Sequence, residues 1–376
     1  MSPGLFSNGM LALLLVLLTS SWSLAEIVED PDLSENNRDP TTIPVFLKQT
    51  YKAFSELAFD SDKYPYDHEF TQRLFTEGSP TIREVVLTFL LAFGFILFRY
   101  FSESKFRRLV IWLEFKPGDV EKAPEGIFRS LYYCVITGYG AYISYFSGRY
   151  NFIQQPCEVY SSNVTWENYF EQEIPTDILS LYWIQFSYYL SGVYMELYMD
   201  KRRKDSTMML LHHFVTLSLM YFSYMGRYLK HGCIIFFLND ISDAILETGK
   251  ICVYFNNRGG VVRKYGDIFC NIIFFFFTVS WFYFRLYLFC VRLLHSSNWC
   301  AYIQRKIWRP RLYVFFNLLL WTLYIMQMIW SYYIIKMCVR LITGQDKQLE
   351  DIREKEINGN GGKPQTNGFS KEKKEK

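Results

Sequence analysis

The sequence has little of what a metal-dependent or disulfide-linked protein needs. It contains five histidines, whereas a di-iron lipid oxidase would need many more, and it has no metal-type CxxC spacing. Six of the eight cysteines fall in apolar runs, where we expect small hydrophobic side chains, and only Cys157 and Cys300 fall in expected loops. We therefore expect no disulfide framework and no bound metal. The net charge of +3 says little by itself, and we expect no nucleic-acid partner.

Long apolar runs, in contrast, are abundant. Segments such as NIIFFFFTVSWFYF (271–284) and FFNLLLWTLYIMQMIW (315–330) stand between short charged loops. Because about 20 apolar helical residues span the bilayer core, the sequence predicts an all-α polytopic membrane protein. We expect about seven transmembrane helices, near residues 84–101, 127–146, 178–199, 207–225, 232–255, 268–294 and 313–338.

The two ends of the chain differ from this pattern. The run LALLLVLL (11–18) followed by SWSLAE (21–26) indicates a signal peptide over residues 1–25 that is cleaved after Ala25. An uncleaved signal anchor is the alternative, since no Lys or Arg precedes the apolar core. We expect residues 26–83 to form a lumenal segment before the first span at 84–101. The charged residues 344–376 are expected to form a disordered cytosolic tail.

Basic residues orient the spans. A cluster of them stands directly before the span at 207–225: Lys201, Arg202, Arg203 and Lys204. The loop at 147–177 holds one basic residue and the glycosylation sequon at Asn163, which is modified only in the lumen. Both features favour a lumenal N-terminus and a cytosolic C-terminus. The loop at 295–312 disagrees, because its basic residues would then be lumenal.

Polar side chains interrupt two of the expected spans. MMLLHHFVTLSL (208–219) contains His212 and His213, and FFLNDISDAILETGK (236–250) contains Asp240, Asp243 and Glu247 on one helix face. Each ionised group at the bilayer centre costs ~2.5–3.5 kcal/mol unless it is paired or hydrated. An imidazole beside a carboxylate suits proton transfer or nucleophilic attack. We interpret the set as a reaction site within reach of the cytosol.

Two other interpretations remain open for these residues. The histidines could be structural, with the carboxylates balancing Lys250 or Arg285. A zinc site is the weaker alternative, because adjacent histidines point about 100° apart on a helix and cannot easily share one ion.

A longer pattern surrounds this polar set. The stretch YMDKRRKDSTMMLLHHFVTL…FFLNDISDAILETGKICVYFNNRGG (198–260) resembles the Lag1 motif of the ceramide synthases, a family with a TLC domain. The resemblance continues through WFYFRLYLF (281–289), YVFFN (313–317) and LITGQDKQLEDIRE (341–354). It implies a catalytic domain over 102–343 in which six helices form a barrel.

The resemblance also implies an activity. It is N-acylation of a sphingoid base by a fatty acyl-CoA in the endoplasmic reticulum membrane, and the NNRGG and LITGQ segments resemble the subclass using stearoyl-type acyl-CoA. His212 and His213 match the family's essential histidines, and Asp240 and Asp243 its essential aspartates. Either an imidazole acts as general base or an acyl-imidazole forms, with His212 the favoured nucleophile.

Substrates and partners follow from the same resemblance. No cofactor is expected, because acyl-CoA is an activated substrate. The acyl-CoA phosphates would meet the basic cluster at 201–204, although a topology anchor is an equal explanation of that cluster. Family members also associate as homo- or heterodimers. The terminal KEKKEK resembles a dilysine retrieval signal, and the loop at 295–311 resembles the segment linked to acyl length.

One position departs from the family pattern. Asn239 stands where the family usually has histidine, and an amide cannot shuttle a proton. We predict that Asn239 and Glu247 contact substrate, but a non-catalytic lipid-binding or regulatory TLC protein stays open as an alternative. A seven-span receptor is a third hypothesis, favoured only by the expected span count.

Overall fold

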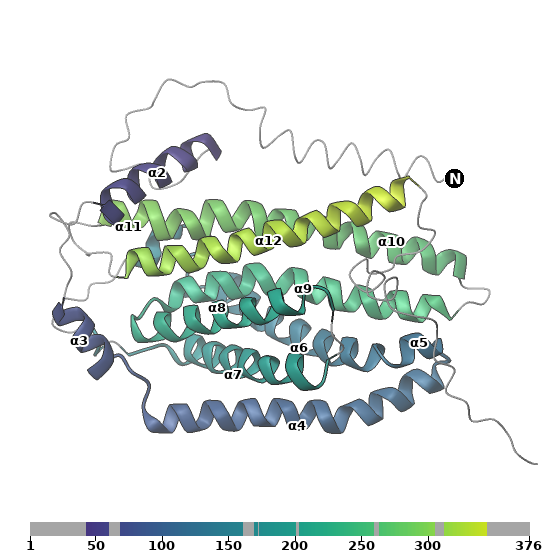
Figure 1. Ribbon diagram of the computed structural model, residues 1–376. Coiled ribbons are helices and arrows are strands. Elements are labelled where there is room, and N and C mark those ends of the chain that lie inside the picture. Colours follow the sequence, from purple (N-terminus) through teal and green to yellow (C-terminus); the bar gives the residue numbers. More distant parts are fainter. Residues whose placement is uncertain are drawn as a thin grey trace, which may run out of the picture.

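The computed structural model describes residues 43–59, 68–160, 169–171, 173–200, 203–258, 263–304 and 312–343, and within these ranges every regular element is a helix (Figure 1). The expected signal peptide, the sequon at Asn163, the basic residues Lys201 and Arg202, and the tail lie outside the described residues. The long elements are α4 (Ile82–Trp112), α6 (Ala123–Ala141), α7 (Thr176–Tyr198), α8 (Ser206–Met225), α9 (Leu229–Asn257), α10 (Arg263–Ser280) and α12 (Tyr313–Ile342).

Shorter elements complete the described chain. Two helices precede the first long one, and π-helical turns extend α6 and α10. These elements are α2 (Ile43–Phe59), α3 (His68–Thr76), α5 (Pro117–Val120), η1 (Tyr142–Phe146), η2 (Pro156–Tyr160), η3 (Trp281–Leu294), η4 (Ser296–Cys300) and α11 (Ala301–Gln304).

Each segment expected to span the membrane coincides with one long helix. Three helical stretches of the described chain are long and apolar enough to cross a membrane: Ile82–Trp112, Tyr265–Ile303 and Tyr313–Ile342. An all-helical membrane protein is therefore shown, while the count of seven spans and the barrel stay predictions. Helices α7 and α9 bury polar side chains, among them Gln185, Asp240 and Glu247.

The helix α4 illustrates how the sequence sets both the start and the environment of an element. A capping box opens it: the Thr81 backbone N–H donates to Glu84 Oε2 at 2.7 Å, and the Glu84 N–H donates to Thr81 Oγ1 at 3.3 Å. Beyond the cap, large apolar side chains such as Phe89, Leu90 and Phe93 stay exposed along the helix. Such a continuous apolar surface suits lipid rather than water.

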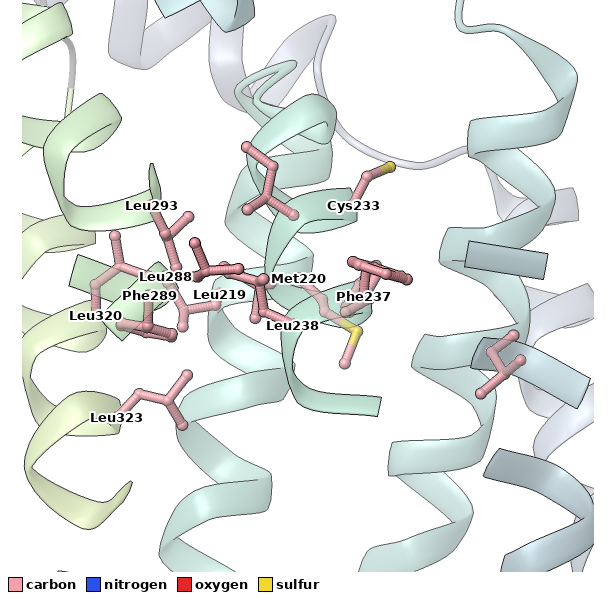
Figure 2. Packing of buried hydrophobic residues seen from close by; sticks show 14 of the residues in the cluster. Leu219, Met220, Cys233, Phe237, Leu238, Leu288, Phe289, Leu293, Leu320 and Leu323 are labelled. Carbon is pink, nitrogen blue, oxygen red and sulfur yellow. The ribbon is translucent and has the colours of Figure 1, made fainter. Parts of the chain in front are cut away.

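The core forms around α9, which contacts α6, α7, α8, α10 and η3. Figure 2 shows its central layer, where side chains of α8, α9, η3 and α12 meet, among them Leu219, Leu238, Phe289 and Leu320. Every residue from His231 to Asp240 is buried. The polar groups of α9 are therefore placed inside the helix assembly rather than toward lipid.

Two expectations about the far end of the molecule are wrong. Cys157 and Cys300 form a disulfide, with 5.1 Å between their Cα atoms and 143 residues between them in sequence. The segment 295–304, expected as a loop, is helical, and its residues 295–302 are buried; Trp299 packs against Ala53 of α2 and Tyr302. Sequence alone cannot show that two distant segments meet, so neither contact had a local signature.

Candidate active site

A cavity of about 450 Å³ lies among α6, α7, α8, α9, α10, η3 and α12. We call it the near cavity. It brings together four residues of the polar set, His212, His213, Asp243 and Glu247, which come from α8 and α9. Asp240 and Asn239 lie on the same helix as Asp243 but do not line the cavity.

His213 is held by its backbone and by a close neighbour. Its Nδ1 lies 2.7 Å from the Met209 carbonyl oxygen, so this nitrogen carries the proton and donates. The other nitrogen, Nε2, therefore carries the lone pair. It lies against Gly192 of α7, where an added Cβ would come within 2.8 Å of Nε2. Glycine at 192 thus permits this ring position, although no sequence pattern indicated its importance.

His212 is held by aromatic rings instead. Its ring centroid lies 5.5 Å from that of Trp330, at 83°, and 6.0 Å from that of Tyr189. Its buried Nδ1 has no hydrogen-bond partner. Among the described residues, no hydrogen bond joins either imidazole to a carboxylate. The histidines and acids share a cavity rather than forming a preset dyad.

Asp243 is paired with Arg285 of the π-helix η3, with 2.6 Å between Arg285 Nη2 and Asp243 Oδ2. The same guanidinium donates to Ser242 Oγ at 2.7 Å and to the Asn239 carbonyl oxygen at 2.8 Å. It also lies 4.3 Å from the Trp281 ring centroid. A structural partnership with Arg285, one of the interpretations left open, is thus present for this carboxylate.

Asp240 has a different partner, because it is buried at 2 % exposure and accepts a hydrogen bond from Gln185 Nε2 of α7. Tyr132 of α6 in turn donates to Gln185 Oε1 at 2.9 Å. Sequence analysis missed both residues. Their only signal was a polar side chain within an apolar span.

Glu247 and Asn239, the other two residues predicted to contact substrate, lie in different places: one lines the cavity and the other is in the core. Glu247 lines the near cavity and accepts from Lys250 Nζ at 2.7 Å. Asn239 faces α12, where its Oδ1 accepts from Gln327 Nε2 at 2.9 Å, and its Nδ2 donates to the Ile235 carbonyl oxygen at 2.8 Å.

Basic residues gather at one end of the near cavity. Among the lining residues are Lys122, Arg129, Arg203 and Lys250. Of the predicted cluster at 201–204, Arg203 lines the cavity, whereas Lys204 is exposed and does not. Arg129, which sequence analysis did not select, is the additional guanidinium that tertiary folding brings there.

An ion-pair network supports this end. Arg129 contacts both Glu125, at 3.0 Å, and Asp200, while Arg203 contacts Glu125 at 3.1 Å and Arg99 contacts Asp200 at 3.4 Å. Arg99 also lies 4.0 Å from Glu103, so three guanidiniums face three carboxylates within this network. Arg129 and Arg203, which both line the cavity, are held there by their carboxylate partners.

A second, smaller cavity of about 60 Å³ lies toward the disulfide, and we call it the far cavity. It is lined mainly by apolar side chains of α8, α9 and α12, including Leu219, Met220, Ile235 and Leu320. Aromatic and polar groups close it, among them Tyr160 and His231.

The possibility of a metal site can be checked against side-chain geometry. Within the described ranges, one group of candidate ligand atoms lies within 4.8 Å of one another: Cys157, His295 and Cys300. Because the two sulfur atoms are bonded to each other, they are not thiolate ligands in this state.

Comparisons with known proteins decide the family. Residues 122–336 match the TLC domain family. Ceramide synthase 1 from Homo sapiens is 36% identical over 272 residues, covering 72% of this chain and 75% of the relative. The chain belongs to the ceramide synthase family. Ceramide synthase LOH2 from Arabidopsis thaliana is 29% identical over 70% of this chain and 88% of the relative.

The predicted ceramide synthase family is therefore confirmed. All residues that line the near cavity except Asp119 and Met337 fall within the matched TLC domain. Residues 122–336 contain both histidines, Asp240, Asp243 and their partners Gln185 and Arg285. They also contain both cysteines of the disulfide. The roles of the site residues are not tested by this match and stay predictions.

Proposed function

We propose that this chain is a sphingoid base N-acyltransferase, which forms ceramide or dihydroceramide from a fatty acyl-CoA and sphingosine or sphinganine. The observation that carries the proposal is the paired histidines that line a cavity together with acidic and basic side chains, in the TLC domain of a ceramide synthase family member. Both relatives are named ceramide synthases, which supports the proposal.

The reaction forms an amide bond and breaks a thioester. The amine nitrogen of the base replaces the CoA sulfur at the acyl carbon, and one amine proton must be passed to the leaving thiolate. His213 suits the proton transfer, since its Nε2 is the lone-pair nitrogen. His212 is the favoured nucleophile if an acyl-imidazole forms. Both side chains line the same cavity, so either mechanism would take place in this one site.

The acids would act through position and charge. Asp243 with Arg285 holds a fixed dipole in the cavity that the histidines line, and Asp240 with Gln185 holds a second one on the same helix outside the cavity lining. Fixed dipoles stabilise charge that develops in a transition state without the reorganisation that water needs. Tyr133 and Tyr189 line the cavity and offer hydroxyl donors to the oxyanion. Glu247 with Lys250 would contact substrate nearer the mouth.

The mouth would hold the CoA phosphates. Arg129, Arg203 and Lys122 line it, and the predicted cluster Lys201, Arg202 and Lys204 would extend it from adjacent positions in sequence. Arginine pairs with phosphate through two parallel N–H donors. The acyl group would then point inward, toward the histidines. We keep the stearoyl-type preference and the absence of a cofactor as parts of this proposal.

Orientation and location are proposed from the disulfide. Disulfides persist in oxidising compartments, so the end with Cys157 and Cys300 would be lumenal, as expected for the loop carrying Asn163. A lumenal disulfide agrees with the proposed endoplasmic reticulum membrane location and with a cytosolic mouth and tail, while the count of seven spans is proposed from the sequence. Four further parts of the proposal rest on the sequence alone: the domain boundaries, the six-helix barrel, the cleaved signal peptide and dimer formation.

The non-catalytic alternative was motivated by Asn239. Because its side chain bonds Gln327 and does not line the near cavity, asparagine at this position removes no group from the cavity. The geometry therefore favours catalysis over binding alone.

The test is acylation of sphinganine by membranes from cells that lack ceramide synthase activity and express this chain. A panel of acyl-CoA lengths gives the product profile. His212→Ala and His213→Ala should each lose product at matched expression, by about 10²–10⁴-fold for loss of a proton-transfer group. An active wild type and equally active variants would refute the assigned roles. No wild-type product would favour the non-catalytic alternative.

A further inference from the structure

One carboxylate of the near cavity lacks the pairing that the others have. Five acidic residues line this cavity: Asp119, Glu196, Asp205, Asp243 and Glu247. Four of them meet a donor, which is Asn257 for Asp119, Trp330 for Asp205, Arg285 for Asp243 and Lys250 for Glu247. Glu196 of α7 forms no ion pair with any residue that the structure describes.

The cations nearest to Glu196 are engaged by another acid. Arg129 and Arg203 are the basic side chains whose charges act on Glu196, and both guanidiniums contact Glu125. Ser206, whose hydroxyl faces Glu196, accepts from the Arg203 backbone N–H at 2.9 Å. Glu196 itself is half-buried and lines the cavity. A partly desolvated carboxylate without a cation of its own favours a cationic ligand.

The position of Glu196 on α7 brings it next to the histidines. Gly192, four residues earlier, is the residue against which His213 Nε2 lies. Side chains four residues apart stand one above the other on one helix face, with Cβ atoms about 5–6 Å apart, and lean toward the helix N-terminus. Glu196 therefore leans toward Gly192, which places no side chain of its own between the carboxylate and Nε2. The carboxylate and the lone-pair nitrogen border the same part of the cavity.

We propose that Glu196 binds the ammonium group of the sphingoid base and holds it beside His213. This inference rests on the proposed function. The base is a primary amine, which is protonated at neutral pH as lysine is. In direct transfer, His213 Nε2 takes one proton from the bound ammonium, and the freed amine forms the C–N bond at the thioester carbon. The C–S bond breaks, and a second amine proton passes to the leaving thiolate, while the Glu196 carboxylate stays ionised.

The first test measures charge preference in binding, which needs no turnover. Labelled sphinganine on the purified full-length protein is displaced either by N,N-dimethylsphinganine, a cation that cannot form an amide, or by the neutral analogue with a hydroxyl group in place of the amine. We expect the wild type to bind the cation at least about tenfold more tightly, the scale of one charge-assisted contact. Glu196→Gln, which keeps the size but not the charge, should lose this preference, and Glu196→Asp should retain it. Glu196→Ala serves the same purpose as Glu196→Gln if that variant does not accumulate.

Kinetics separate this role from a structural one. Glu196→Gln should raise KM for sphinganine at least about tenfold and leave KM for acyl-CoA within about twofold, because one substrate alone loses a contact. The matched control is Glu173→Gln, which removes an exposed carboxylate ahead of α7 and should keep both constants. A wild type without the charge preference, an unchanged preference in Glu196→Gln, or an equal rise in both KM values would overturn the proposal. A wild type that shows the preference but makes no product would refute the proposed function and support Glu196 as the ammonium site.

Discussion

The near and far cavities share the helices α8, α9 and α12 but differ in the chemistry of their linings. The near cavity holds charge, and its cations are paired: Arg285 contacts Asp243, and Lys250 contacts Glu247. The far cavity is mainly apolar, and amide and hydroxyl bonds surround its floor. The difference matches a substrate whose reactive, charged part and apolar tail must be held in one molecule. Substitutions in the two regions should therefore have different measurable effects.

The largest effect is expected from a substitution that removes one charge of a buried ion pair in the near cavity. Arg285→Met leaves Asp243 without its cation, and breaking a buried pair costs about 3–5 kcal/mol. We expect strong loss of thermal stability in detergent, measured as the melting temperature. Asp243→Asn combined with Arg285→Met should recover much of that loss, because the double variant buries no lone charge. Equal melting temperatures in single and double variants would contradict the pairing.

The next effect concerns geometry rather than charge. Gly192→Ala would place a Cβ within 2.8 Å of His213 Nε2, so the ring must move. A misplacement of about 1 Å can cost on the order of 10²-fold in rate. We expect kcat to fall by about that factor, with little change in KM for acyl-CoA.

A matched control isolates this contact. Gly138→Ala also adds a methyl group to a helical glycine, but nothing lies within 4 Å of that Cβ. It should keep wild-type kcat. Similar losses in both variants would point to a general helix effect instead of displacement of His213.

The cavity mouth should give a smaller effect with a distinct signature. Arg203→Gln removes a guanidinium that lines the mouth and pairs with Glu125. We expect KM for acyl-CoA to rise about tenfold, the loss of roughly one charge-assisted hydrogen bond. The salt dependence of KM should weaken, since one fewer cation attracts the phosphates. A fall in kcat with unchanged KM would argue against phosphate binding.

The sequence predicted residues of the near cavity but not the far cavity, and the reason is physical. Charged residues in an apolar run carry a cost that must be offset, so His212, Asp240 and Asp243 were visible as a set. Gln185, the partner of Asp240, and Arg129, which also lines the cavity, were not, because only tertiary packing decides which residue of another helix supplies a contact. The helices were predicted from the length of the apolar runs. The role of Gly192 and the Cys157–Cys300 bond could not be predicted, because both depend on contacts between segments that are distant in sequence.

The smallest expected effect concerns Asn239, the position that departs from the family pattern. Its side chain bonds Gln327 and Ile235 between the two cavities and does not line the near one. Asn239→His can still bond Gln327 through a ring nitrogen, so we expect kcat to change by less than about threefold, under ~1 kcal/mol. Asn239→Leu, which leaves the buried Gln327 amide without its acceptor, should cost about 1–3 kcal/mol of stability. A large gain in kcat for Asn239→His would mean that the imidazole reaches the reacting groups, and that the boundary between the two cavities opens during turnover.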